Sequence, residues 1–250
     1  MNLRDIREEV WAIARETGDT DETRLWPTNE MNMYINRTYR YLARETRCIR
    51  DAVTPSVCMV TIAPIDYLTL TPGTIDYIWA NDPNSWLYQK TVTPLYIALN
   101  PLILEVEEGK WTYKQWKMRK VSVNKWQVNP WWEQVTGTMA TEFATDYSSN
   151  TVAFNYRSEA TDIFRMVVKR MPLVDLIYDT DIPEIRVQYH DFMKHGILWQ
   201  MYSKQDTQTI DVAKAADYYK QFLLDVDEVK QQESMIERKL NVSYSMDGFR

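Results

Sequence analysis

The stretch DIPEIRVQYHDFMKHGILWQMYSKQD, residues 181–206, decides how the chain is organised. It follows a long segment rich in β-branched and aromatic residues, and its apolar side chains return to the spacing of a helix. Asp181 and Glu184 stand three apart around Pro183, which predicts a capped helix start. The apolar stripe of this helix is expected to contain Ile185, Tyr189, Phe192, Gly196 and Trp199.

Another helix is predicted further towards the C-terminus. It is expected to begin near Asp206 or Thr207 and to run to about Gln232. Its inward stripe is predicted to consist of Val212, Ala216, Tyr219, Leu223 and Val226. Residues 234–250 are short and mixed in character, and we expect them to form an extended arm without a core of its own.

Two amphipathic helices are predicted at the beginning of the chain. The first carries Leu3, Ile6, Val10 and Ile13 at steps of three and four residues. The second starts at Pro27, with Thr28 as a candidate cap. Its stripe contains Met31, Ile35, Thr38, Leu42 and Ile49. Because four amphipathic stripes need a common core, the helices from both chain ends are expected to pack together.

The predicted fold class is therefore α+β. It is a four-helix bundle formed by the N- and C-terminal helix pairs, with an inserted β-rich region, sandwich- or barrel-like, and a C-terminal arm. The expected parts are the N-terminal helical hairpin 1–51, the β-rich region 52–176, the C-terminal helical pair 177–233 and the arm 234–250. The strand predicted at 162–172 has no purely apolar face, so we expect it at an edge or against a partner chain.

The composition favours a protein that makes contacts over one that catalyses a reaction. Ten Trp and sixteen Tyr stand beside six Gly in 250 residues, as in interfaces and ligand platforms. The net charge of −6 provides no general attraction for nucleic acid. Cys48 and Cys58 form no CxxC pair and indicate reduced thiols. The chain has no long apolar run, so we expect a soluble protein made in the cytoplasm, without membrane contact.

The two histidines, His190 and His195, are the first candidates for a metal site. Five positions rotate a helical side chain by about 140°, so the pair is not expected to share a metal ion. The acidic residues Asp175, Asp179 and Asp181 lack the Gly and the closing Glu of a calcium loop, and they indicate turns and caps. Nucleophile and phosphate-loop motifs are missing. We therefore expect no metal, no cofactor and no enzyme activity.

A Trp- and Lys-rich segment, KWTYKQWKMRKVSVNKWQVNPWW, covers residues 110–132. One interpretation is a platform that stacks single-stranded nucleic acid or glycan beside cations. A second is a hairpin whose rings pack on the sheet, and a third is a protein interface. The last two rank about equally, above stacking on a polymer. The interface hypothesis concerns Trp111, Trp116, Trp126, Trp131 and Trp132.

In the order of its parts, the chain resembles a protein family of tailed bacteriophages. These proteins are the head-to-tail connector adaptors of short-tailed and related phages. The resemblance rests on LRDIREEVWAIARET and LWPTNEMNMYINRTYRYLARETRCIRDA at the N-terminus, and on NTVAFNYRSEATDIFRMVVKRMPLVDL, the IPE and YH of the quoted stretch, and AKAADYYKQFLLDV. Two positions depart from the pattern: Pro27 replaces a more usual Ser or Thr cap, and Tyr156-Arg157 replaces the Pro that commonly follows the strand at Phe154.

The resemblance implies a virion structural protein at the head-tail junction. It implies a homo-oligomeric ring of twelve copies below the portal protein, joined to a downstream tail or nozzle protein. Genomic DNA would pass through the lumen without sequence-specific binding. We expect the arm to contact the portal through Met235, Ile236, Leu240, Tyr244 and Phe249, because a tail without a core cannot bury them alone.

Two alternatives from other classes stay open. One is a glycan-binding or peptidoglycan-cleaving tail protein that uses the Trp- and Lys-rich region together with Glu105 or Glu107. The other is a module that binds single-stranded nucleic acid with an affinity that falls steeply as salt rises.

Overall fold

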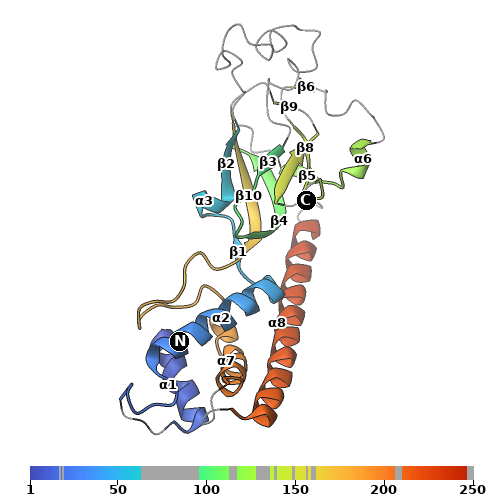
Figure 1. Ribbon diagram of the computed structural model, residues 1–250. Coiled ribbons are helices and arrows are strands. Elements are labelled where there is room, and N and C mark those ends of the chain that lie inside the picture. Colours follow the sequence, from blue (N-terminus) through green and yellow to red (C-terminus); the bar gives the residue numbers. More distant parts are fainter. Residues whose placement is uncertain are drawn as a thin grey trace, which may run out of the picture. The chain divides into compact units, whose positions relative to one another are not determined.

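The computed structural model describes residues 1–16, 18, 20–62, 96–112, 117–127, 136–137, 140–147, 150–155, 157–158, 162–205 and 210–246. The fold is α+β, and the chain divides into two compact units. Unit 1 combines Met1–Ile49 with Arg170–Arg250, and unit 2 is Arg50–Lys169 (Figure 1). Unit 2 is therefore inserted in sequence between the two segments that build unit 1.

Along the chain, two helices of unit 1 come first, the elements of unit 2 follow, and the remaining helices of unit 1 come last. In order they are α1 (Leu3–Ala14), α2 (Thr28–Thr46), β1 (Arg50–Asp51), α3 (Pro55–Cys58), β2 (Met59–Ile62), β3 (Tyr96–Ala98), β4 (Ile103–Trp111), β5 (Lys117–Lys120), α6 (Asn124–Gln127), β6 (Thr136–Gly137), β7 (Glu142–Ala144), β8 (Thr151–Phe154), β9 (Arg157–Ser158), β10 (Asp162–Arg170), the 3-10 helix η3 (Val187–Tyr189), α7 (Met193–Tyr202) and α8 (Val212–Met246).

Helix α1 begins with a capping box, in which Asn2 and Asp5 each accept a hydrogen bond from the other's backbone N–H. Leu3, Ile6 and Val10 are buried as expected, whereas Ile13 is 43% exposed. The stripe therefore ends one turn earlier than its spacing predicts.

The N-terminus of helix α2 is capped by a side chain from the preceding loop. Thr28 is its first residue and not its cap, and Pro27 at the cap position makes no side-chain hydrogen bond. The Asp21 carboxylate accepts from the Thr28 backbone N–H at 3.2 Å and from the Thr28 hydroxyl at 2.6 Å. A loop residue thus provides the acceptor that a Ser or Thr cap would supply.

Helix α7 is shorter than expected and starts at Met193. Asp181 and Glu184 do not cap a helix, because both carboxylates bond to the preceding segment. Asp181 Oδ2 accepts from the N–H of Ile177 and Tyr178, and Glu184 Oε1 accepts from the N–H of Leu173. The predicted helix start at residue 183 is therefore wrong.

Helix α8 is longer than expected, since it runs as one helix to Met246. Asp211 Oδ1 accepts from the Lys214 N–H at 3.0 Å in its first turn. The sequence has no Gly or Pro between Val212 and Met246, so nothing in it interrupts the backbone hydrogen bonds. Residues 234–246 are helical, and the predicted extended conformation is wrong for them.

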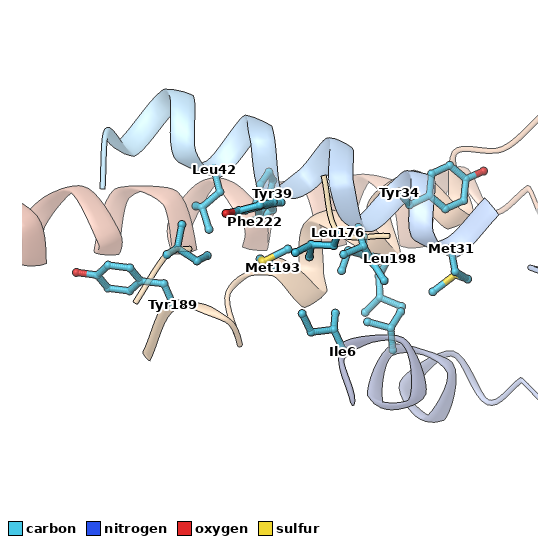
Figure 2. Packing of buried hydrophobic residues seen from close by; sticks show 14 of the residues in the cluster. Ile6, Met31, Tyr34, Tyr39, Leu42, Leu176, Tyr189, Met193, Leu198 and Phe222 are labelled. Atoms are coloured by element: carbon cyan, nitrogen blue, oxygen red, sulfur yellow. The ribbon is translucent and has the colours of Figure 1, made fainter. Parts of the chain in front are cut away.

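The four helices α1, α2, α7 and α8 contribute to one buried cluster. Figure 2 shows Ile6 from α1, Tyr39 and Leu42 from α2, and Phe222 from α8 pointing towards one another. All of these side chains are almost fully buried. Helices from both chain ends therefore contribute side chains to one common core.

Unit 2 contains a mixed sheet in the order β1-β10-β4-β5-β7-β8-β3, with β2 also paired to β10. β5 and β7 pair in parallel, whereas β10 is antiparallel to β1 and β2. β10 has neighbours on both sides, so its predicted edge position is wrong. Its face with Phe164, Met166 and Val168 is buried.

Candidate interaction surfaces

An apolar surface lies on the segment that links β10 to η3. Val174, Ile177, Tyr178 and Ile182 are each between 62% and 71% exposed, and we call these four residues the loop surface. Isolated exposed apolar residues are ordinary, but four large ones within nine positions are typical of a contact site. Sequence reasoning assigned this segment only to turns and caps.

The loop surface is held by the core of its own unit. Leu176, between the exposed residues, is 5% exposed, and Figure 2 shows it among the side chains of the helices. Asn36 of α2 accepts from the Leu176 N–H at 2.8 Å and donates to the Leu176 carbonyl at 2.9 Å. This two-bond clamp satisfies the backbone of an irregular segment, much as a β ladder does.

The acidic residues of the same segment are engaged by arginines. Arg40 of α2 donates to Asp175 at 2.5 Å, and Arg7 of α1 donates to Asp179 at 2.9 Å. These acids are structural, which agrees with the prediction that they mark turns. Because the segment is fixed before any partner arrives, docking on it carries a small entropic cost of ordering.

A hollow of about 350 Å³ opens beside the loop surface. Besides the four exposed residues, it is lined by Tyr39, Asp175, Leu176, Asp181 and Glu184. The Tyr39 hydroxyl accepts from the Glu184 N–H at 2.7 Å, and burial raises the pKa of Tyr39. The hollow therefore has an apolar wall over a floor of fixed polar groups.

A second apolar surface lies on α8. Val212, Ala216, Tyr219 and Leu223 form one line along the helix, and we call them the helix stripe. All four are exposed, with Val212 at 71%, Leu223 at 38% and Tyr219 at 37%, and the Tyr219 ring also packs against Trp199 of α7, with the ring centroids 4.6 Å apart. The prediction that this stripe faces the core is wrong, although Val226 is buried as expected. The core-facing residues are Ala215, Phe222, Val226 and Val229.

The two surfaces lie on different sides of unit 1. The part of the segment that carries the loop surface is bonded to α1 and α2 through Asp179 and Asp175, and only its end, at Arg186, pairs with Glu233 of α8, which packs against α7 and α2. Figure 1 shows this segment and α8 on opposite sides of the unit, with α2 and α7 between them. One subunit therefore presents two separate apolar surfaces.

The two histidines do not form a site. His190 is fully buried, its Nε2 donates to the Ile185 carbonyl at 3.1 Å, and burial lowers its pKa. His195 Nδ1 is bonded to Asp225 Oδ2 at 2.6 Å. His190 precedes α7, so the helical rotation argument does not apply, yet the two rings have separate partners. Among the described residues, no three His, Cys, Asp or Glu side chains are grouped as metal ligands.

Two of the five tryptophans in the interface hypothesis pack inside unit 2. Trp111 is 2% exposed, donates to the Ala140 carbonyl at 2.8 Å and contacts Phe154 and Phe164. Trp126 is 7% exposed and donates to Glu142. The structure thus places these two rings as core packing predicts. Trp116, Trp131 and Trp132 lie outside the described residues.

Several charged residues that the structure describes around these rings are ion-paired within unit 2. Lys117 bonds Glu108 at 2.8 Å, and Lys120 lies 3.6 Å from Glu105. Glu107 is bonded by Arg50 at 2.5 Å and lies 3.3 Å from the Lys169 ammonium group. The two carboxylates of the glycoside-hydrolysis alternative, Glu105 and Glu107, are thus held in ion pairs, whereas Lys114 and three of the tryptophans of the stacking alternative lie outside the described residues.

Four of the five residues expected to contact the portal lie in the C-terminal part of α8. Met235 is 59% exposed and Ile236 is half-buried. Two residues before Met235, Glu233 is bonded by Tyr189 at 2.6 Å and by Arg186 at 3.1 Å. The remaining three are only partly covered by the structure: the backbone is described for Leu240 and Tyr244, and Phe249 lies outside the described residues.

A comparison with protein families finds a match to the family described as SU10 adaptor protein over residues 1–243. The chain therefore belongs to the SU10 adaptor protein family, which agrees with the resemblance to phage head-to-tail adaptors. Family membership supports a phage structural adaptor in the virion, with contacts to portal and tail components. A search of curated proteins found no match. None of the described helices has the length and apolar character that a membrane crossing requires.

Proposed function

We propose that this adaptor forms a closed ring of twelve copies below the portal, joins the portal to the tail and lets DNA pass through its lumen. The observation that carries the proposal is the pair of exposed apolar surfaces on unit 1. A ring built from identical subunits uses two different surfaces on each of them, one for each neighbour. A net charge of −6 suits a channel along which DNA slides without binding.

The C-terminal end of α8 is the proposed portal contact. Among the α8 side chains that the structure describes, up to Arg238, none after Val229 belongs to the buried cluster, yet the helix continues to Met246. Met235 and Ile236 stand on this extension, and Leu240, Tyr244 and Phe249 follow them in the sequence. A helix that extends beyond its own core can add its apolar residues to a groove of another protein.

The β-rich unit 2 is proposed to face a neighbouring subunit or the next tail component. The core packing of Trp111 and Trp126 leaves Trp116, Trp131 and Trp132 as the residues of that hypothesis. Their substitution by Ala is expected to weaken binding of the tail component while portal binding stays unchanged.

Deletion of residues 234–250 tests the portal assignment. We expect the shortened protein to lose portal binding in a pull-down with the purified portal ring. The far-UV spectrum should lose only the helical signal of residues 234–246, because the core lies before them. Val53→Asp is the control, since Val53 is 78% exposed in unit 2. Portal binding by the shortened protein at wild-type affinity would contradict the assignment.

A further inference from the structure

We infer that the helix stripe of one subunit docks on the loop surface of a second copy of this chain. The inference rests on the proposed ring and identifies the contact between its neighbours. It joins Tyr219 and Leu223 of one copy to Ile177, Tyr178 and Ile182 of the next.

The shapes of the two surfaces match a helix in a groove. The hollow of about 350 Å³ has Val174, Ile177, Tyr178 and Ile182 along its apolar wall. An amphipathic helix enters such a groove with anchors spaced three, four and seven residues apart. Val212, Tyr219 and Leu223 of the helix stripe stand seven and four apart, and Ala216 leaves room between them.

The charges beside the two surfaces are complementary. Arg37 is exposed one turn before Arg40, which bonds the loop at Asp175, and no described carboxylate pairs with Arg37. Asp217 is exposed next to the helix stripe, and no described cation pairs with it. Docking brings an unpaired base and an unpaired acid to the same contact, which selects the orientation of the helix.

The position of the surfaces leads to a ring and not to a symmetric pair. In a two-fold dimer the same surface meets itself, which would join two loop surfaces with like apolar walls and leave both helix stripes uncovered. A contact between two different surfaces on opposite sides of unit 1 repeats from copy to copy, and it closes into a ring when the rotation between neighbours divides a full turn; any other rotation would give an open filament. Each copy then covers both of its exposed apolar surfaces.

Two charged substitutions test the contact, and native mass spectrometry of the protein alone and mixed with the purified portal ring is the assay. Ile177→Asp changes the loop surface and Leu223→Asp changes the helix stripe, and Val53→Asp is the exposed control. Each of the first two should weaken subunit association at least about thirtyfold, as loss of a central apolar anchor does. All three variants should keep the far-UV spectrum of the wild-type protein.

Mixing the two defective variants gives the decisive result. The Ile177→Asp chain keeps an intact helix stripe and the Leu223→Asp chain keeps an intact loop surface, so the mixture should form dimers that cannot extend to rings. Assembly of rings by either variant alone, or a mixture that stays monomeric, would overturn the inference. If the wild-type protein forms no ring with or without the portal, the proposed function fails together with it.

Cross-linking places the contact at residue level. Tyr178→Cys and Leu223→Cys chains should form disulfide-linked dimers under mild oxidation only when the two are mixed. The native Cys48 and Cys58 are 5% and 0% exposed, so they give little background. Cross-linking of the Tyr178→Cys chain with itself would show a symmetric contact and refute the inference.

Discussion

Gly196 lies where α2, α7 and α8 meet. Replacing it by Ala raises the helix propensity of α7 but overpacks the contact between the three helices. A Cβ at this position would lie 2.6 Å from Thr38 Cγ2 and 2.9 Å from Phe222 Cε2, whereas ordinary contact begins at 3.4 Å. The helices must therefore move apart by several tenths of an ångström. Overpacking of this kind costs about 3 kcal/mol, and the gain in helix propensity is about 1 kcal/mol.

We expect Gly196→Ala to lower the stability of unit 1 by about 2 kcal/mol and its Tm by about 5 °C. Thermal melting and hydrogen exchange of α7 amides measure the two quantities. Thr38→Ser is the matched change, because it removes Cγ2 and keeps the hydroxyl that accepts from Gln200 Nε2 at 2.7 Å. In the double variant, the two effects should couple by at least about 0.5 kcal/mol. A higher Tm for Gly196→Ala, or strict additivity, would refute the packing argument.

Three further predictions concern single residues. Burial raises the pKa of Cys48 to about 11. At pH 8 its thiol should therefore react at least about a hundredfold more slowly in the folded protein than after denaturation. A chromogenic thiol reagent measures the two rates. Ser122 donates to Asp146 at 2.6 Å and lowers the pKa of that carboxyl below its usual 3.8. This stabilisation is present above about pH 4 and is lost as the pH falls through the folded-state pKa, so Asp146→Asn should flatten the acid limb of the unit 2 stability curve. Trp111→Phe leaves the Ala140 carbonyl without its donor and opens a cavity. The free energy of unfolding of unit 2, measured in urea, should therefore fall by about 3 kcal/mol. A loss below about 1 kcal/mol would contradict the assignment of Trp111 to the core.

The candidate site shows how far sequence reasoning reached. The apolar residues of 234–250 were predicted to contact a partner because a short tail without a core cannot bury them. The loop surface was missed, since Asp residues between apolar ones are also typical of turns. A local signal did exist: Leu173, Val174, Leu176, Ile177 and Tyr178 are more apolar than a solvent-exposed turn requires.

The sequence predicts a helix pair at each end of the chain with a β-rich region between them, because hydrophobic periodicity is a local property. Which side of α8 is buried depends on its packing against α7 and α2. Its two apolar lines lie next to each other, and the one with Phe222 meets α7 and α2 while the one with Leu223 faces outward. The same holds for the start of α7, where Asp181 and Glu184 bond to a loop instead of capping a helix. A local pattern gives the possible partners of a side chain, and the non-local packing selects one of them.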